Sequence, residues 1–235
     1  MGSPVRRLGD TTWPEVATTS PQTLLAVPFG STEQHGPHLP LDTDTRIAVA
    51  IAEGFAERRS DVVIAPPLSY GSSGEHAGFA GTLSLGQAAL EHVALELCRS
   101  ADAFAGVVLV CGHGGNDEPL RRATDVIRDE GRQVLLWFPS IVGGDAHAGV
   151  TETSLLLAIA PDAVHLDRAE PGTTTALAEL MPRLRDEGVR AVSRNGVLGD
   201  PSGASAAGGE QMLAGLVDDL CTAVARWTGH PTGSR

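Results

Sequence analysis

Two patterns of apolar and polar positions succeed each other along this chain of 235 residues. Short, continuous apolar runs predict strands buried on both faces, as in a parallel sheet; they lie at Leu24–Phe29, Val62–Ala65, Val107–Cys111 and Gln133–Phe138. Longer stretches with apolar residues at helical spacing predict helices; they span Thr45–Arg59, Gly86–Phe104, Asn116–Glu130, Thr151–Ala160, Thr173–Glu187 and Ala204–Trp227. This alternation predicts an α/β fold with a mostly parallel sheet covered by helices on both faces.

The chain shows no internal repeat, and its length suits one large domain or two small ones. A weak candidate for a domain boundary is the Gly-, Ser- and Ala-rich segment Leu198–Gly209. We interpret that segment as a loop, because a single predicted helix follows it. We therefore expect one domain over residues 1–235, with a frayed tail at Gly229–Arg235.

The loop after the first predicted strand concentrates groups that bind metals. Glu33, His35, His38 and Asp44 lie within twelve residues, between the strand and the next helix. In an open α/β sheet, such strand-to-helix loops form the ligand site. Carboxylates and imidazoles suit Zn²⁺, Mn²⁺ or Fe²⁺. A polar loop with a helix-capping Asp is the plainer interpretation, but two further loops favour a metal site.

Those two loops follow the next central strands. His113 comes directly after Val107–Cys111, and His147 and Glu152 follow Gln133–Phe138. Because the carboxyl ends of parallel strands meet at one edge of the sheet, the three loops can converge on one site.

Composition excludes several functions. A formal charge of -12 argues against nucleic-acid binding, which depends on cationic contacts to phosphate. The sequence contains no lysine, which removes Schiff-base chemistry and a Walker lysine. Three widely spaced cysteines suit a reducing compartment, and no segment has the pattern of a signal peptide or membrane span. We therefore expect a cytoplasmic protein without nucleic-acid or membrane partners.

These motifs together resemble the creatininase (creatinine amidohydrolase) family. The resemblance rests on five stretches and covers about residues 8 to 228: Glu33-x-His35-Gly-x-His38-Leu-Pro-x-x-x-Asp44, Gly74-Glu-His76-Ala-Gly-Phe-Ala-Gly-Thr-Leu-Ser84, Gly112-His113-Gly-Gly-Asn116, His147-Ala-Gly-x-x-Glu152-Thr-Ser and Gly199-Asp-Pro-Ser-Gly-Ala-Ser205. The opening Leu8-Gly-Asp-Thr-Thr-Trp13 is similar to the mycofactocin-system branch, whose members trim the C-terminal end of a modified precursor peptide.

The resemblance implies a three-layer α/β/α sandwich with two divalent ions per subunit, Fe²⁺ or Zn²⁺, with Mn²⁺ as a further option. By motif position, Glu33, Asp44 and His113 would hold one ion. His35 and Asp44 would hold the second, with Asp44 bridging. Creatininase itself has a ligand glutamate where this chain has Gly115. We expect Glu152 to fill that gap in preference to Glu118. The alternative is that Glu152 is only a first-turn acid, which the helix dipole favours.

Other motif residues receive provisional roles. His147 is expected to donate a proton to the leaving amine, or alternatively to make a supporting hydrogen bond. His38 is expected to brace its proline-flanked loop. The Gly74–Ser84 loop with Glu75 and His76 is expected to border the substrate, as is Asn116, unless the loop is an ordinary connection.

Three functions remain open from the sequence. The first is a metal-dependent amide hydrolase, a peptidase that releases a C-terminal fragment from a modified mycofactocin precursor peptide by a metal-activated hydroxide. The second is hydrolysis of a small cyclic amide or formamide at the same site. The third is a non-catalytic, metal-stabilised protein. Family resemblance further implies a homo-oligomer, with a hexamer expected.

Overall fold

The computed structural model describes residues 5–229; the segments 1–4 and 230–235, which hold most of the predicted tail, lie outside the described residues. Within them, parallel strands form one sheet in the order β2-β1-β3-β4. The strands are β1 (Leu24–Phe29), β2 (Val62–Ile64), β3 (Gly106–Cys111) and β4 (Val134–Trp137). The predicted parallel sheet is confirmed. Pro28 is tolerated in β1 because β2 pairs only with residues 24–26, so no β2 partner faces the missing N–H.

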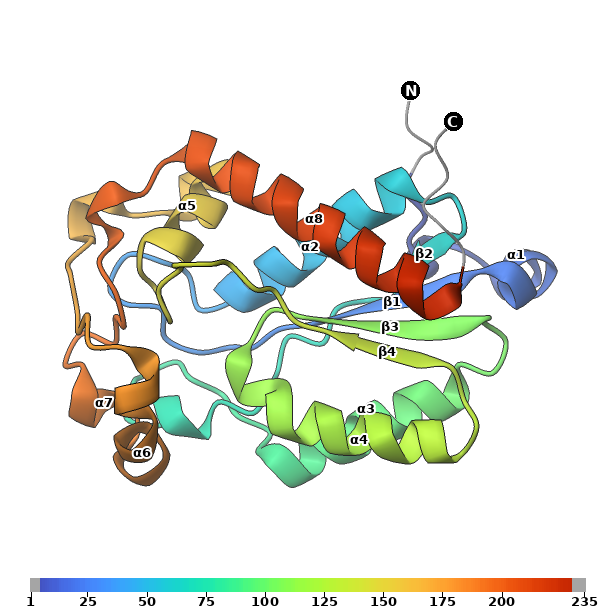
Figure 1. Ribbon diagram of the computed structural model, residues 1–235, viewed down its shortest axis with the longest axis horizontal. Coiled ribbons are helices and arrows are strands. Elements are labelled where there is room, and N and C mark those ends of the chain that lie inside the picture. The colour runs from blue at the N-terminus through green and yellow to red at the C-terminus, as the bar shows by residue number, and fades with distance from the viewer. Residues whose placement is uncertain (1–4, 230–235) are drawn as a thin grey trace.

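Helices form a layer on each face of the sheet (Figure 1). The upper layer in Figure 1 contains α2 (Thr43–Arg58), α5 (Val150–Ile159) and α8 (Ala206–Thr228). The lower layer contains α3 (Gln87–Ser100) and α4 (Asp117–Asp129). The expected three-layer α/β/α sandwich is therefore confirmed. No helix in the described part of the chain is long and apolar enough to cross a membrane.

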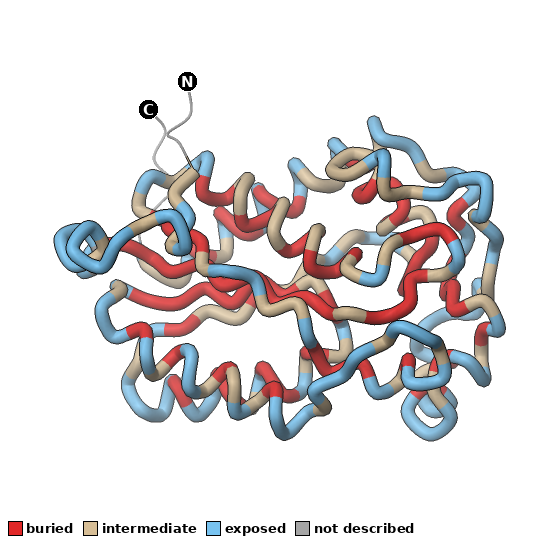
Figure 2. The backbone as a smooth tube through the Cα atoms, turned by 180° about the vertical axis from the view of Figure 1, so that it is seen from behind, coloured by how far each residue is buried: buried red, intermediate tan, exposed pale blue. Residues whose placement is uncertain are grey.

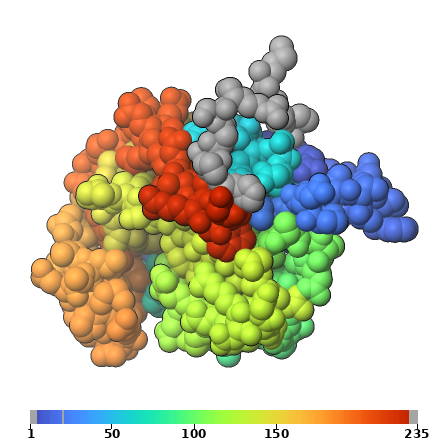
Figure 3. Space-filling model, turned by 45° about the vertical axis from the view of Figure 1, so that its right-hand side comes forward, coloured from blue at the N-terminus to red at the C-terminus, as the bar shows by residue number. Residues whose placement is uncertain are grey.

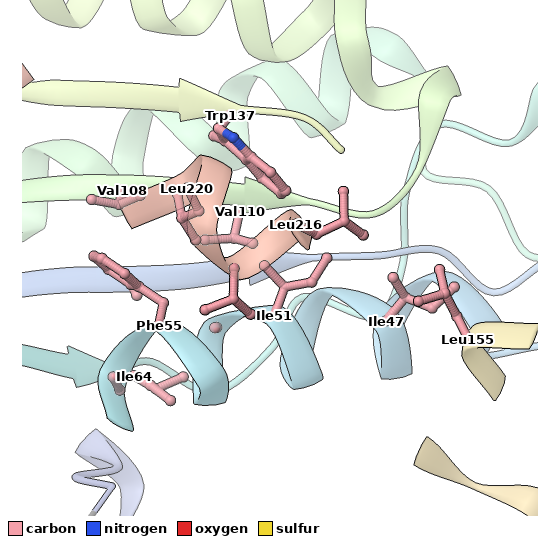
Figure 4. Close-up of a cluster of buried hydrophobic side chains, with 14 of the residues drawn as sticks. Ile47, Ile51, Phe55, Ile64, Val108, Val110, Trp137, Leu155, Leu216 and Leu220 are labelled. Carbon is pink, nitrogen blue, oxygen red and sulfur yellow. The ribbon is translucent and has the colours of Figure 1, made fainter. Parts of the chain in front are cut away.

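Side chains of each strand point alternately into the two helical layers. Val108 and Val110 of β3 face α2 and α8, whereas Val107 and Leu109 face α3 and α4. Figure 4 shows the first of these cores, where aliphatic and aromatic side chains of both helices cover the sheet: Ile47, Ile51, Phe55, Leu216 and Leu220. Strands β1, β2 and β3 are buried along their length and β4 is buried at both ends, while the outer helix faces are exposed (Figure 2).

Within residues 5–229, the α-helices outside the sandwich are α1, α6 and α7. The helix α1 (Trp13–Thr19), which the hydrophobic pattern does not predict, precedes β1. The pair α6 (Leu177–Glu187) and α7 (Val189–Val192) lies beyond the carboxyl ends of the strands (Figure 1). The predicted helix over 173–187 begins late, because the Thr173 N–H donates to the Val197 carbonyl and holds that stretch outside the helix. Gly188, with φ of 78°, separates α6 from α7.

The strand order places the expected site at a reversal point in the sheet. The chain runs from β1 through α2 to β2, then returns through α3 on the opposite face to β3. The loops after β1 and β3 therefore leave the sheet side by side toward opposite layers. This is the crevice where open α/β sheets bind ligands.

Candidate metal centre

The loop after β1 folds back tightly onto the first turn of α2. A β-carbon on Gly30 would collide with the backbone of Thr45, so this close approach requires glycine. The Glu33 N–H donates to the Leu41 carbonyl (2.9 Å), which closes the loop. The fold thereby brings Glu33 and His35 of the loop against Asp44 in α2, and all three are almost fully buried.

A first group of donors combines this loop with the one after β3. Single ligand atoms of Glu33, Asp44 and His113 all lie within 4.8 Å of one another. His113 stands between the two acids: its Nε2 is 3.1 Å from Glu33 Oε2 and its Nδ1 is 3.1 Å from Asp44 Oδ2. These residues are 80 positions apart in sequence at most, yet the fold places them at one point, as expected from the strand order.

A second group adds the loop after β4. Ligand atoms of His35, Asp44 and Glu152 also lie within 4.8 Å of one another. His35 Nε2 is 3.0 Å from Asp44 Oδ1 and 3.8 Å from Glu152 Oε2. Asp44 thus belongs to both groups, with Oδ2 turned to the first and Oδ1 to the second. All five residues expected as ligands lie together here.

Glu33 is the clearest sign that these groups suit a cation. Its side chain is fully buried, and neither carboxylate oxygen accepts a hydrogen bond of regular geometry within residues 5–229, while the imidazoles of His113 and His76 lie 3.1 and 3.2 Å from these oxygens. A buried carboxylate is costly unless a positive charge compensates it. Burial raises the pKa of Glu33 to about 7. Carboxylate and imidazole donors around an unsatisfied acid fit a divalent ion such as Zn²⁺ or Mn²⁺.

Without an ion, protons balance the charges of this cluster. Burial lowers the pKa of His35, but the carboxylates of Asp44 and Glu152 outweigh it and hold this pKa at about 10. Burial is likewise outweighed at His113, whose pKa is raised to about 10 by Glu33 and Asp44. In return, both imidazoles hold the pKa of Asp44 well below its ordinary value despite burial. Burial raises the pKa of Glu152 to about 7.

His147 lies at the edge of both groups with a fixed ring orientation. Its Nε2 donates to the Gln34 carbonyl (2.8 Å), which leaves Nδ1 as an acceptor. Nδ1 faces two acids, Glu152 Oε2 at 3.9 Å and Glu33 Oε1 at 4.0 Å. Burial, then the charges of nearby His35 and His76, keeps the pKa of His147 well below its ordinary value. The imidazole is therefore neutral at pH 7, with Nδ1 unprotonated.

Gln34 is a site residue that the sequence analysis missed. Its buried amide donates to His76 Nδ1 (2.9 Å) and to the Gly196 carbonyl (3.1 Å), and lies 3.0 Å from His147 Nε2. A β-carbon on Gly196 would collide with this amide. Gln34 thus orients two imidazoles at once. The signal for it was its place between Glu33 and His35, but a loop glutamine alone does not predict such contacts.

Two further polar contacts hold the loop residues in place. Ser31 donates its hydroxyl to Asp44 Oδ2 (2.7 Å), which fixes the carboxylate. His38 is fully buried, and its Nε2 is 2.9 Å from the hydroxyl of Thr153 in α5. His38 therefore ties the loop after β1 to helix α5.

The residues expected at the substrate lie in different surroundings. His76 is buried, with Nε2 3.2 Å from Glu33 Oε1, and burial lowers its pKa to about 3. Asn116 is also buried; its amide donates to the Gly30 carbonyl (3.0 Å) and accepts from the Ser72 N–H (2.8 Å). Asn116 therefore joins three loops and has no exposed surface for a substrate. Glu75 is different, because its side chain is 31% exposed.

Comparison with known proteins gives a consistent assignment. Residues 9–224 match the creatininase family, described as creatinine amidohydrolase. A mycofactocin precursor peptide peptidase of Mycolicibacterium smegmatis is 51% identical over 233 residues, covering 96% of this chain and 93% of the relative. A creatinine amidohydrolase of Pseudomonas putida is 31% identical over 194 residues, covering 68% of this chain and 74% of the relative.

Solved structures agree with the sequence relatives. One described as "Creatininase Mn" aligns with a TM-score of 0.80 at 28% identity, covering 94% of this chain and 98% of the other. A creatininase variant described as "Zn-Zn type" aligns with a TM-score of 0.80 at 27% identity, covering 95% and 98%. With its fold, loop motifs and nearly full-length match, the chain belongs to the creatininase family.

Proposed function

We propose that this chain is a metal-dependent amide hydrolase that holds two divalent ions around Asp44. The observation that carries this proposal is the pair of donor groups that share Asp44. Glu33, Asp44 and His113 would hold one ion, and His35, Asp44 and Glu152 the other. Both relatives reported above are named for the cleavage of amide bonds, and solved relatives carry manganese or zinc in their descriptions.

The chemistry of such a centre is hydrolytic. When bound, two ions polarise an amide carbonyl and make a water molecule acidic near neutral pH. Fe²⁺, Zn²⁺ and Mn²⁺ all accept this mixture of carboxylates and imidazoles. In this proposal Glu152 supplies the second carboxylate, which Gly115 cannot supply.

His147 moves the proton in this proposal. Its Nε2–H is held by the Gln34 carbonyl, so Nδ1 is the atom that can accept. Nδ1 lies 4.0 Å from Glu33 Oε1 and 3.9 Å from Glu152 Oε2, so it faces the space between the two acids. His147 therefore receives the proton of the attacking water at Nδ1 and returns it to the leaving amine. Gln34 is a positioning residue that sets this ring orientation.

We propose a peptide as the substrate, namely a modified mycofactocin precursor peptide from which a C-terminal fragment is released. The name of the Mycolicibacterium smegmatis relative and its 51% identity support this choice. The molecular surface is also hollowed between the α6–α7 lobe, in orange, and the yellow-green region of α4 (Figure 3). Residues around 70–80, in teal, lie at the depth of this hollow.

Hydrolysis of a small cyclic amide is the second candidate. The Pseudomonas putida relative, named creatinine amidohydrolase, favours it, as does the description of the family. Both candidates use the same donors and the same proton carrier, so the substrate decides between them.

The test compares the two substrates directly. The Mn²⁺-loaded protein is incubated with a modified precursor peptide or with creatinine, and products are followed by mass spectrometry. EDTA-treated protein and the Asp44→Ala variant are the controls, and both should be inactive. Cleavage of the peptide with intact creatinine supports the proposal. Turnover of creatinine with an intact peptide favours the second candidate, and turnover of neither favours a non-catalytic metal protein.

We also propose that the chain forms a homo-oligomer. Four large apolar side chains are between 39% and 55% exposed on neighbouring loops beside the site: Leu41, Tyr70, Leu83 and Leu85. Hydrogen bonds from the Leu83 N–H to the Thr32 carbonyl and from the Leu85 N–H to the Gly71 carbonyl hold these loops together. A mass in solution equal to one chain, measured by light scattering, would refute this assembly.

A further inference from the structure

His76 is buried beside the metal centre but is not one of its expected ligands. It comes from the short 3-10 turn Gly74–His76, in the loop between β2 and α3. None of the groups of convergent ligand atoms within residues 5–229 includes it. Only 4% of its surface is exposed, so His76 has almost no surface to offer a substrate. Its role therefore lies in its contacts with other side chains of the centre.

Gln34 fixes which ring nitrogen of His76 carries the hydrogen. The Gly36 N–H donates to Gln34 Oε1 (2.9 Å), and this contact sets the orientation of the amide. Gln34 Nε2 therefore directs its hydrogens to His76 Nδ1 (2.9 Å) and to the Gly196 carbonyl (3.1 Å). Because Nδ1 accepts a hydrogen bond, the single hydrogen of this imidazole lies on Nε2.

The Nε2–H of His76 faces the Glu33 carboxylate. Nε2 lies 3.2 Å from Glu33 Oε1, although the contact lacks regular hydrogen-bond geometry. Since the terminal torsion of a glutamate is soft, a small rotation of the carboxylate would align the two groups.

The other imidazole beside this carboxylate cannot take over that contact. His113 Nε2 lies 3.1 Å from Glu33 Oε2, but it also lies 3.0 Å from the Ser72 carbonyl, to which it donates. Its hydrogen is therefore already engaged. Of the two imidazoles, His76 is the one with a hydrogen free for Glu33.

The ring of His76 also packs against the proposed proton carrier, His147. The two ring centroids are 4.6 Å apart and the ring planes are inclined by 49°. His35 makes a similar contact with His147, at 4.3 Å and 40°. His76 thus contacts both an expected metal ligand and the residue that moves the proton.

The backbone that carries His76 is anchored by the α6–α7 lobe. The Phe79 N–H donates to the His76 carbonyl (3.1 Å), and Phe79 packs against the buried apolar cluster of the lobe. The Arg190 guanidinium donates to the Gly78 carbonyl (2.6 Å) and lies over the ring of Phe79, 5.9 Å from its centroid. These contacts fix the turn from which the imidazole projects.

We infer that His76 is a positioning residue of the metal centre, whose Nε2–H orients the Glu33 carboxylate toward the ion that it shares with Asp44 and His113. Loss of a side chain that orients a metal ligand typically costs ~10–100-fold in metal affinity or activity. This inference rests on the proposed two-ion site, and it replaces the substrate contact expected for His76 from the sequence.

Two substitutions separate the two ring nitrogens of His76. The amide nitrogen of glutamine can take the place of Nε2, so His76→Gln keeps a donor that faces Glu33. The amide oxygen of asparagine can take the place of Nδ1, so His76→Asn keeps only the acceptor that faces Gln34. His76→Ala keeps neither group. The matched control is His92→Asn, at an exposed position in α3.

Metal affinity and activity are measured for each protein. Mn²⁺ is titrated into the metal-free protein, with free Mn²⁺ followed by electron paramagnetic resonance. Cleavage of a modified precursor peptide by the Mn²⁺-saturated protein then gives kcat and KM. Thermal unfolding of the metal-free proteins checks that the fold is retained.

In His76→Asn and His76→Ala, one Mn²⁺ ion should bind ~10–100-fold more weakly, with a lower kcat and an unchanged KM. His76→Gln should recover most of the lost Mn²⁺ affinity, and the control should match the wild type. Because the Mn²⁺ titration needs no substrate, it decides the inference whichever amide the protein cleaves.

Three results would overturn the inference and leave the two-ion site standing. Recovery by His76→Asn but not by His76→Gln would place the role of His76 at Gln34. Equal losses in these two variants would show that the donor at Nε2 does not matter. Wild-type Mn²⁺ affinity and kcat with a raised KM in His76→Ala would return His76 to the substrate. Wild-type protein that binds no Mn²⁺ would instead refute the proposed function itself.

Discussion

Removal of the metal should make the stability of this protein depend on pH in a defined direction. In the metal-free protein, His35 and His113 have pKa values of about 10, against an ordinary value of 6.5. The folded protein therefore keeps protons that the unfolded chain loses above pH 6.5. Their stabilising contribution is complete below pH 6.5 and is lost as pH rises from 6.5 through 10.

The magnitude follows from the number of protons retained. One proton held by the folded but not the unfolded state changes the free energy of unfolding by ~1.4 kcal/mol per pH unit. Because His35 and His113 share Asp44, we take one net retained proton for the pair. The free energy of unfolding of the metal-free protein should then fall by ~2–3 kcal/mol between pH 7 and pH 9. This is a large part of the ~5–15 kcal/mol typical of a folded domain.

Other groups with shifted pKa values do not obscure the loss of stability expected between pH 7 and pH 9. The carboxyls of Glu33 and Glu152 have pKa values raised from 4.5 to about 7. Their stabilising contribution is therefore lost as pH rises from 4.5, and this loss is largely complete by pH 7. The lowered pKa values of His76 and His147 affect stability only in more acidic solution. Burial raises the pKa values of Cys98 and Cys111 to about 11 and about 12, so these thiols contribute only near and above pH 9.

The assay is urea unfolding of EDTA-treated protein at several values between pH 7 and pH 9. Asp44→Asn is the matched control, because it removes the charge shared by both imidazoles and should abolish most of the slope. Saturating Mn²⁺ should also remove the loss, since coordination requires deprotonated imidazoles and strengthens as pH rises. Metal-free stability that is constant or increases from pH 7 to pH 9 would refute this description of the site.

Three further results are expected. His147→Ala should slow peptide cleavage by ~10²–10⁴-fold with the Mn²⁺ content unchanged, and loss of an ion would make His147 a ligand instead. Phe55→Ala, at a fully buried position, should lower the free energy of unfolding in urea by ~3–5 kcal/mol, whereas exposed Val126→Ala should change it by less than ~1 kcal/mol. EDTA should abolish cleavage but leave far-ultraviolet circular dichroism nearly unchanged at pH 7; global unfolding would indicate a structural metal.

The sandwich is predictable from sequence because its elements have strong, regular patterns. The strand Val107–Cys111 is a continuous apolar run and is buried throughout as β3. The helix α8 has Ser205 as its N-cap, with its side chain accepting from the Gly208 N–H, and ends at Gly229 with φ of 68°. Elements outside the sandwich are less predictable. The helix α1 buries no residue, so it has no apolar stripe to reveal it.

The convergence of the loops is also predictable, but their fine contacts are not. Glu33 and His113 follow neighbouring parallel strands, so strand order alone brings them to one edge of the sheet. The contacts of Gln34 with His76 and His147 depend on the path of three loops, which no local pattern encodes. The position of Glu75 depends on Gly115 and on the α6–α7 lobe, which are far from it in sequence.

The most direct test of the shared-carboxylate centre is a crystal structure of the Mn²⁺-loaded protein with anomalous diffraction data. The proposal predicts two anomalous peaks ~3.5–4 Å apart, with one oxygen of Asp44 bound to each ion. Glu33 and His113 should complete one site, and His35 and Glu152 the other. A single peak, or two peaks that Asp44 does not join, would contradict the proposed centre.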